Sequence, residues 1–333
     1  MLQKMLLVAA VAVFLSHFAA MYQASAYERV PQKPAIVLAA FGTTEVEAVH
    51  SILNIMERVE KAFPEYDVHL VFTSSIIRNI WHRRANDAAF RAENTDIPEK
   101  IYGVRNILST LAGIQEGGTR LILVQSLHVT DGEEYKDMTN LIKALAEYET
   151  QKPARKPFPW IAVGDPALGV GDGKDQYLER AAEALAPLAR KAWETGSALV
   201  LMGHGNEHFP QEVYGRLESV MRKKYGPQVY IGTVEVAPFP EDIVEAIAGS
   251  ENAPKTIFLA PLMVVAGDHA RNDMAGDEED SWLSIFEAAG YEVDVHLVGL
   301  GSNESWADIY VEHLKAIETP LLEKKAKDEA EEE

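Results

Sequence analysis

Two apolar runs that begin 163 positions apart and end in the same way constrain the fold more than any other feature of the chain. Ala35–Ala40 is followed by Phe41-Gly42, and Ala198–Met202 is followed by Gly203-His204-Gly205. Short continuous apolar runs bounded by glycine are typical of strands that are buried on both faces of a parallel sheet. The sequence therefore predicts two similar units, each opening with one of these strands.

Two further pairs of segments correspond to one another in the same order along the chain. Val68–Ser74 matches Val229–Glu235 at an offset of 161, and Ser126–Glu134 matches Pro261–His269 at an offset of 135. Chance rarely gives three matches in one order, so we interpret the halves as copies of one another. The shrinking offset places insertions in the first half, chiefly near residues 81–94.

Apolar runs with strand character alternate with segments of helical periodicity along most of the chain. The predicted strands cover 35–40, 68–72, 120–126, 160–163, 198–202, 229–234, 256–265 and 292–297, and the predicted helices cover 45–63, 98–115, 137–148, 176–194, 211–224, 241–248, 280–289 and 303–317, the last capped by Ser302. This alternation predicts the α/β fold class, with two similar open parallel-sheet, Rossmann-like domains facing a central cleft.

The predicted domains follow from the two copies. The N-terminal α/β domain spans 34–194, the C-terminal domain spans 195–302, and a terminal helix covers 303–320. Residues 321–333 form an acidic tail, which we expect to be solvated and frayed because it is a run of charges.

The first 26 residues have the features of a secretory signal. An apolar run, Met5–Phe14, precedes Ala24-Ser25-Ala26, which has the small residues that signal peptidase accepts. We expect cleavage after Ala26 and a periplasmic location if the cell has two membranes. An uncleaved anchor is the alternative, but the apolar segment is short, because Ser16 and His17 interrupt it. No later stretch reaches the roughly 18 apolar residues that a spanning helix needs.

Charge and cysteine content exclude several classes of function. Lys and Arg number 31 and Asp and Glu number 51, so the net charge is −20, which disfavours sequence-independent binding of nucleic acid. The chain has no cysteine, which excludes disulfides, thiolate zinc sites, iron–sulfur clusters and cysteine nucleophiles. Neither GxGxxG nor GxxxxGK[ST] occurs, so a dinucleotide site or a P-loop has no support.

Three side chains with metal-binding chemistry follow strands of the second half. His204, Glu235 and His269 each come directly after an apolar run, so they should meet at one edge of one sheet. Two imidazoles and a carboxylate suit a borderline divalent ion. Glu134 is the repeat counterpart of His269 and should reach the same cleft from the opposite domain, although an acid at a helix N-terminus is an equal interpretation.

The residues around these positions complete the predicted site. Phe41, Gly42 and Thr43 follow the first strand, and Gly203 and Gly267 flank the histidines, where glycine lets backbone and ligand approach closely. We expect these five residues to line the cleft, because ligands of open α/β sheets bind beyond the carboxyl ends of the strands. A single histidine is more often a surface or core residue, and for His128, which aligns with Met263, packing is the preferred interpretation.

Three motifs carry a resemblance to a known family. Gln125-Ser-Leu-His128 with Gly132-Glu-Glu-Tyr135, then Met202-Gly-His-Gly205, and then the stretch Pro261–Trp282 resemble the anaerobic sirohydrochlorin cobaltochelatases of the class II chelatase family. The similarity covers residues 34–317, and the stretch that ends at Trp282 is its most specific part.

The resemblance implies a fold, an activity and a set of site residues. It implies two α/β domains that hold a tetrapyrrole between them, a terminal helix that packs back on the first domain, and ATP-independent insertion of Co²⁺ into sirohydrochlorin, a lyase reaction of cobalamin biosynthesis. The metal-binding histidines of the family fall on His204 and His269, its cleft glutamate on Glu134 and a further acidic ligand on Glu235. The signal sequence is a departure, because most such chelatases act in the cytoplasm.

The sequence leaves several alternatives open. One is a sirohydrochlorin ferrochelatase, and Fe²⁺ or Ni²⁺ are also possible substrate metals for the cobaltochelatase. Another is an exported carrier of a tetrapyrrole, haem or metal that keeps a chelatase fold. Haem binding would need a surface histidine such as His82 or His50, and nothing in the sequence selects one. A two-lobed periplasmic solute-binding protein is a third alternative. A homo-oligomer is compatible with the sequence, which fixes no stoichiometry.

Overall fold

The computed structural model describes residues 32–152, 155–171, 175–206 and 212–332. Pro34–Glu333 form one compact unit. The predicted signal peptide, residues 1–26, lies outside the described residues. Among the described helices, none is both long enough and apolar enough to cross a membrane.

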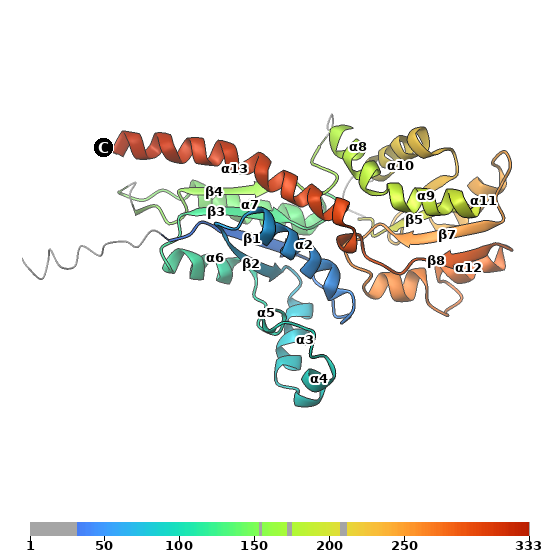
Figure 1. The fold of residues 1–333 in the computed structure, drawn as a ribbon, viewed down its shortest axis with the longest axis horizontal. Helices are drawn as coiled ribbons and strands as arrows, with labels where there is room; N and C mark the ends of the chain where they lie inside the picture. Colours follow the sequence, from blue (N-terminus) through green and yellow to red (C-terminus); the bar gives the residue numbers. More distant parts are fainter. Residues whose placement is uncertain (1–31, 153–154, 172–174, 207–211, 333) are drawn as a thin grey trace, which may run out of the picture. The chain divides into compact units, whose positions relative to one another are not determined.

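Two four-stranded sheets with the same strand order lie at the centre of this unit (Figure 1). The orders are β2-β1-β3-β4 and β6-β5-β7-β8, and every pairing is parallel. The strands are β1 (Ala35–Ala40), β2 (Asp67–Phe72), β3 (Leu121–Ser126), β4 (Trp160–Gly164), β5 (Ala198–Gly203), β6 (Val229–Thr233), β7 (Thr256–Pro261) and β8 (Glu292–Val295). The predicted α/β class with two similar parallel sheets is confirmed.

Helices cover both faces of each sheet, as the strand–helix alternation predicts. They are α2 (Val49–Ala62), α3 (Ser75–Ala85), α4 (Ala88–Glu93), α5 (Glu99–Tyr102), α6 (Ile107–Glu116), α7 (Glu133–Glu147), α8 (Asp175–Ala184), α9 (Ala186–Thr195), α10 (Glu212–Tyr225), α11 (Pro240–Ala248), α12 (Trp282–Ala288) and α13 (Glu304–Glu332), with a π-helical turn η2 (Ala270–Met274) and a 3₁₀ turn η3 (Leu300–Ser302).

Alternation along β1 divides the hydrophobic core into layers. Ile36 and Leu38 point to the layer that contains α2 and α13, whereas Val37 and Ala39 point to the layer that contains α6 and α7. Because both faces of the strand are covered, all its residues are buried, which explains the continuous apolar run in the sequence. The α2 and α13 layer continues through α8 into α9 and α10, which cover one face of the second sheet.

Two predicted helices are each divided in two. The helix expected over 98–115 becomes α5 and α6, because Asn106 accepts a hydrogen bond from the Ser109 amide at 2.8 Å and starts a new helix. The helix expected over 176–194 becomes α8 and α9, because Pro187 sits at the start of α9 and lacks the N–H that would continue the first helix. Helix α9 packs on β5 and β7 of the second sheet, and the domain boundary after residue 194 stays a prediction.

The insertion in the first half forms helices α3, α4 and α5, which stand out from the sheets (Figure 1). Trp81 lies at its centre, fully buried, with ring contacts to Phe90 and Tyr102. This aromatic cluster is continuous with the core of the first sheet, and the Trp81 indole donates to the Thr43 carbonyl oxygen after β1 at 2.8 Å.

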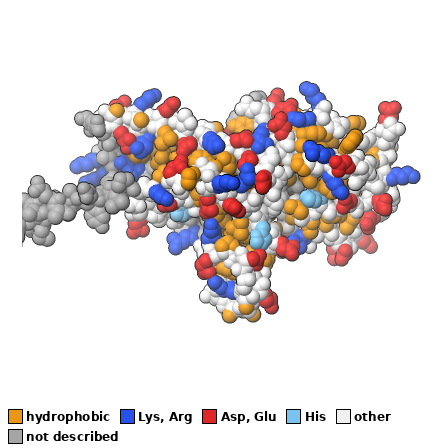
Figure 2. Space-filling model, viewed as in Figure 1, with side chains coloured by type: hydrophobic (Ala, Val, Ile, Leu, Met, Phe, Trp, Pro, Cys, Tyr) orange, Lys and Arg blue, Asp and Glu red, His pale blue; other side chains and the backbone are white. Residues whose placement is uncertain are grey.

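On the face shown in Figure 2, acidic and basic side chains are intermixed and no single-sign field dominates.

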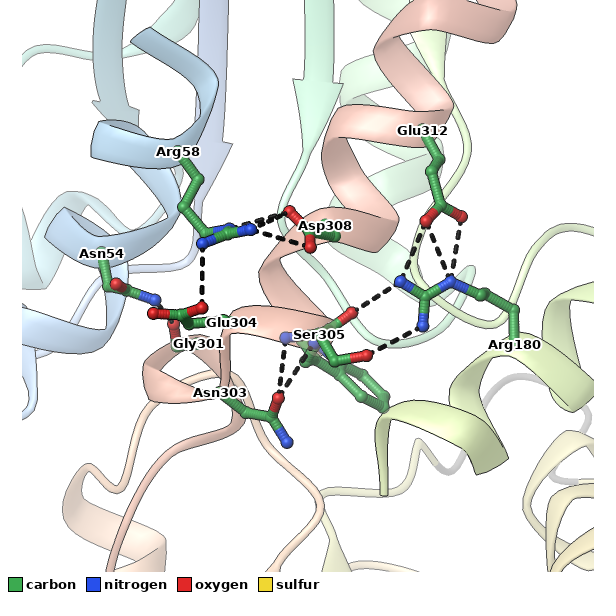
Figure 3. Close-up of polar contacts among 10 residues, drawn as sticks. Asn54, Arg58, Arg180, Gly301, Asn303, Glu304, Ser305, Asp308 and Glu312 are labelled. Atoms are coloured by element: carbon green, nitrogen blue, oxygen red, sulfur yellow. Dashed lines mark hydrogen bonds and ion pairs between the residues drawn. The ribbon is translucent and has the colours of Figure 1, made fainter. Parts of the chain in front are cut away.

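The terminal helix α13 begins between the sheets and runs along the first half. Asp308 forms paired hydrogen bonds of 2.8 Å with Arg58 of α2, and Glu312 binds Arg180 of α8 (Figure 3). The residue that caps the N-terminus of α13 is Asn303 and not the predicted Ser302. The Asn303 side-chain oxygen accepts hydrogen bonds from the backbone amides of Ser305 and Trp306.

Helix α13 also extends further than the sequence predicts. The expected frayed tail is helical to Glu332, where Lys324 pairs with Asp328 one turn later at 2.6 Å. Asp328 also accepts a hydrogen bond of 2.8 Å from the indole of Trp160. The charged run is thus held as a helix by local ion pairs and by the contacts of Asp328 and Lys325 with Trp160 of β4.

Candidate functional site

A cavity of about 1240 Å³ opens at the carboxyl ends of both sheets. It lies where the strand order reverses, beyond β1 and β3 in one sheet and beyond β5 and β7 in the other, which is where open α/β sheets bind ligands. Pockets for drug-sized ligands have volumes of roughly 300–1,000 Å³, so this cavity suits a larger molecule. Its lining includes Phe41, Gly42, Thr43, His128, Glu133, Glu134, His204, Tyr214, Glu235, Gly267, Asp268 and His269.

His204 and His269 meet on one wall of this cavity. Their ring centroids are 4.7 Å apart and the planes are at 89°, an edge-to-face contact. The His204 side chain is 45% exposed and the His269 side chain is 42% exposed, so both rings are open to a ligand. They come together because β5 and β7 are neighbours in the sheet and end at the same edge.

The Nδ1 atom of each ring faces a hydrogen-bond acceptor. His204 Nδ1 lies 3.0 Å from the Gly205 carbonyl oxygen, and His269 Nδ1 lies 2.5 Å from Asp273 Oδ2. These contacts favour the tautomer with the proton on Nδ1, and in a neutral ring of that tautomer the lone pair is on Nε2. Metal-binding histidines commonly have this arrangement, in which the partner of the second nitrogen sets the tautomer.

Glu235 extends the pair of histidines along the same edge. Its amide donates to the His204 carbonyl at 3.1 Å, continuing the β5–β6 ladder, and its Oε1 lies 3.7 Å from His204 Nδ1. Among the described residues, no three acidic or histidine side chains already stand close enough together to hold a metal ion. Joint coordination by Glu235 and both histidines would therefore require a rotation of side chains, which their partial exposure allows.

Glu134 reaches the cavity from the other half, at the N-terminus of α7. Glu133, Glu235 and Asp268 also line the cavity, and no Lys or Arg is among its described lining residues. This excess of negative charge attracts cations into the cleft. The sequence predicted Glu134 here through its correspondence with His269, and both residues line one cavity, Glu134 from the first half and His269 from the second.

Glycines at equivalent positions of the two halves shape the loops behind the site. Gly42 and Gly205 have φ values of +100° and +84°, and a Cβ atom on Gly205 would lie 2.6 Å from Thr233 Oγ1. Only glycine adopts such a turn without strain. Gly203, which was expected to line the cleft, does not: it is covered by Tyr214, which a Cβ atom there would approach to 2.7 Å.

Sequence reasoning missed three contributors to the site. Tyr214, on α10, lines the cavity and hydrogen-bonds with the Gly205 backbone and with Thr130 of the opposite half. Asp273 orients His269, and its spacing of four residues on the same turn was the available signal. His128 was expected to pack, yet it also lines the cavity. Its Nδ1 lies 2.8 Å from Ser126 Oγ, and burial lowers the pKa of its imidazole to about 4.

The two histidines considered for haem lie elsewhere and have partners. His82 Nε2 is 2.7 Å from the Val104 carbonyl oxygen, and His50 Nε2 is 2.9 Å from Asp96 Oδ2. Neither residue is among those that line the cavity. The structure provides no observation that favours an axial haem ligand at either position.

The sequence has relatives among characterised proteins. The model of the cobalt chelatase (CbiK) family matches residues 34–319. A sirohydrochlorin cobaltochelatase, CbiKC, of Nitratidesulfovibrio vulgaris is 33% identical over 293 residues, which are 87% of this chain and 92% of that protein. A sirohydrochlorin cobaltochelatase of Salmonella typhimurium is 28% identical over 284 residues, which are 85% of this chain and 95% of that protein.

Solved structures have the same fold at lower identity. SirB from Bacillus subtilis with Fe³⁺ superposes with a TM-score of 0.56 at 13% identity, covering 86% of this chain and 96% of SirB. The sirohydrochlorin chelatase SirB from Bacillus subtilis subspecies spizizenii in complex with cobalt gives 0.53 at 13% identity, covering 86% and 95%. At this identity the likeness shows the shared fold alone.

Proposed function

The chain belongs to the cobalt chelatase (CbiK) family, and on that premise we propose that it inserts Co²⁺ into sirohydrochlorin without ATP. The observation that carries the assignment to this cavity is the pair His204 and His269, whose partly exposed rings meet on one wall of a large space. The carrier and solute-binding alternatives are not favoured, since the relatives that match most of the chain are enzymes.

The histidine wall binds the metal substrate before transfer in this proposal. Imidazole binds ions such as Co²⁺ well without the near-permanence of thiolate, so a bound ion can pass to a ligand with four nitrogens. The Asp273 carboxylate orients His269 through its Nδ1–H, and Glu235 supplies an oxygen as the ion loses water. The acidic lining raises the local concentration of the cation.

The tetrapyrrole occupies the cavity between this wall and Glu134. Two pyrrole N–H protons must leave as the metal enters, and a planar ring shields its own nitrogen lone pairs. Walls that bend the ring expose those lone pairs and so favour the transition state over the planar ground state. Glu134, across the cavity from the histidines, is placed to accept a pyrrole proton or to orient the ring.

The metal that the site inserts depends partly on its ligands and partly on which ions the cell provides. Imidazole and carboxylate ligands bind Co²⁺, Fe²⁺ and Ni²⁺, so the ligand set alone does not select one of the three ions. We propose Co²⁺ as the physiological metal because the characterised relatives are cobaltochelatases. Fe²⁺ and Ni²⁺ are expected to be inserted in vitro.

An insertion assay tests the proposed function directly. Purified chain lacking residues 1–26 is mixed anaerobically with sirohydrochlorin and Co²⁺, Fe²⁺ or Ni²⁺, and the absorption spectrum is followed without ATP. We expect catalytic conversion of many equivalents of tetrapyrrole, fastest with Co²⁺. Stoichiometric binding without metallation would instead indicate a carrier and would overturn the proposal.

We also propose that the protein is exported and acts in the periplasm. The support is the apolar run Met5–Phe14 followed by Ala24-Ser25-Ala26. Fractionation of the source cells and N-terminal sequencing of the mature chain test this, with Tyr27 expected as the first residue. An intact N-terminus on cytoplasmic protein would contradict it.

A further inference from the structure

The two walls of the cavity approach one another beside His269. Phe41–Thr44, in the loop between β1 and α2, line one wall, and Gly267–His269 line the other. A Cβ atom on Gly267 would lie only 3.2 Å from Thr43 Oγ1, so the backbone after β7 comes close to the loop after β1. A residue that joins these segments at this point sets the width of the cleft.

Arg271 joins them. It lies in η2, two residues after His269, and its Nη2 donates to Glu47 Oε2 at 2.8 Å. Its Nε, which is shielded from solvent, lies 3.3 Å from Glu45 Oε2, an ion-pair contact that lacks the geometry of a hydrogen bond. Glu45 and Glu47 belong to the loop after β1, so one guanidinium spans the two halves; we call these three residues the Arg271 clasp. Arg271 is not among the residues that line the cavity.

The loop that carries the two glutamates is itself held in place. The Glu45 amide donates to Thr43 Oγ1 at 3.1 Å, and the Trp81 indole donates to the Thr43 carbonyl oxygen at 2.8 Å. Arg84 donates to the Thr44 carbonyl oxygen at 2.6 Å and lies over the Trp81 ring. The α3–α4 insertion thus anchors the loop, and the Arg271 clasp extends this anchorage to the segment that carries His269.

We propose that Arg271 is a positioning residue for the chelatase reaction. By pairing with Glu45 and Glu47 it holds the Phe41–Thr43 wall at a set distance from His269, and so determines how closely a tetrapyrrole lies against the histidines. The planar guanidinium suits this role because its fork engages two carboxylates at once, which a lysine ammonium cannot do with fixed geometry. The inference rests on the proposed function of the same cavity.

The kinetic test compares Arg271→Gln, the double variant Glu45→Gln/Glu47→Gln and the triple variant. We expect Arg271→Gln to raise KM for sirohydrochlorin about tenfold with a smaller change in kcat, and the triple variant to match it within about twofold, because all three residues act through one interaction. Co²⁺ affinity of the tetrapyrrole-free protein should change less than about twofold. Additive effects, or an unchanged KM, would overturn the proposal.

A second readout needs no enzymatic activity. The chain has no cysteine, so Leu108→Cys on α6 and Trp193→Cys on α9, both exposed, give a unique pair of spin-label sites on the two halves. We expect Arg271→Gln to lengthen or broaden the inter-label distance distribution. The matched control is Arg91→Gln, which breaks a 2.6 Å ion pair with Glu99 away from the cavity and should leave the distribution unchanged.

The two readouts separate the failure of this inference from failure of the proposed function. If wild-type protein bound sirohydrochlorin without metallating it, the proposed function would fail, and Kd for the tetrapyrrole would replace KM in the comparison. If Arg271→Gln changed the distance distribution but neither KM nor Kd, the Arg271 clasp would be structural only and the proposal would be wrong. An unchanged distribution would also contradict it.

Discussion

His204 and His269 meet edge to face at 4.7 Å although one follows β5 and the other follows β7. The Nδ1 atom of each ring lies within hydrogen-bond distance of an acceptor, the Gly205 carbonyl oxygen for His204 and the Asp273 carboxylate for His269. The pair therefore places two imidazoles of set orientation on one wall of the cavity, and in the proposed function this wall binds the metal before its transfer.

Removal of either imidazole should abolish most metal insertion. We expect His204→Ala and His269→Ala each to lower the rate of Co²⁺ insertion by about 100-fold or more, because the wall then keeps a single nitrogen ligand. Both side chains are almost half exposed, so the unfolding midpoint should move little. Wild-type insertion rates in both variants would show that the metal enters elsewhere.

The orienting carboxylate should matter although it is not itself a proposed ligand. Asp273→Asn keeps the size of the side chain but removes the charge that fixes His269 Nδ1–H, so we expect Co²⁺ affinity to fall about 10- to 100-fold. Asp277→Asn, an exposed acid four residues on, is the matched control and should behave as wild type. Cobalt absorption titrations without tetrapyrrole measure both. Equal affinities for the two variants would argue against an orienting role.

Two adjacent glutamates at the start of α7 distinguish a specific role from general negative charge. Glu134 is half-buried in the cavity wall, whereas Glu133 is exposed. We expect Glu134→Gln to lower kcat for insertion about 10- to 100-fold, the usual scale for loss of a proton acceptor, and Glu133→Gln to change it less than about threefold. If both variants lost a similar part of kcat, and if a higher Co²⁺ concentration restored the rate in both, the two acids would serve only to attract the metal.

Acid should destabilise the protein partly through His128. Its two ring nitrogens are covered, and burial lowers the pKa of its imidazole to about 4, against about 6.5 in an unfolded chain. Between these values the unfolded chain binds a proton that the folded chain does not. The contribution of His128 to the free energy of unfolding is therefore full above about pH 6.5, and it is lost as the pH falls toward 4.

His128→Met introduces the residue found at the equivalent position of the second half, Met263. Urea unfolding at about pH 7 and about pH 5 should show wild type losing about 1–2 kcal/mol more than this variant over that interval. Burial also lowers the pKa of His69 and His296, so the variant should keep part of the pH dependence. Identical losses in both proteins would contradict the account.

Two glycines of the second half should respond to alanine in opposite ways. Gly205→Ala places a methyl group 2.6 Å from Thr233 Oγ1 at a positive φ, and we expect it to lower the free energy of unfolding by about 2 kcal/mol or more. Gly215 is exposed inside α10 and has nothing within 4 Å of the position that a methyl group would take, so Gly215→Ala should raise it by up to about 1 kcal/mol. Thermal unfolding of both variants checks the signs.

Much of the fold could be predicted because its signals are local. Continuous apolar runs such as Ala35–Ala40 indicate doubly covered strands, and their recurrence at Ala198 indicates a second sheet. Element boundaries were less predictable, since Pro187 and Asn106 divide helices that periodicity alone joins. The helical end of α13 depends on contacts such as Trp160 with Asp328, which bring together residues far apart in the sequence.

The sequence by itself determined which residue types stand at strand ends, and so predicted a cleft that contains His204, Glu235, His269 and Glu134. Tertiary structure alone decided which acceptor lies beside each imidazole Nδ1, that Tyr214 covers Gly203, and that Arg271 reaches across to Glu45 and Glu47. The physical reason is that strand order brings all strand ends to one edge, whereas hydrogen bonds and ion pairs depend on distances of a few ångströms between elements that no local pattern specifies.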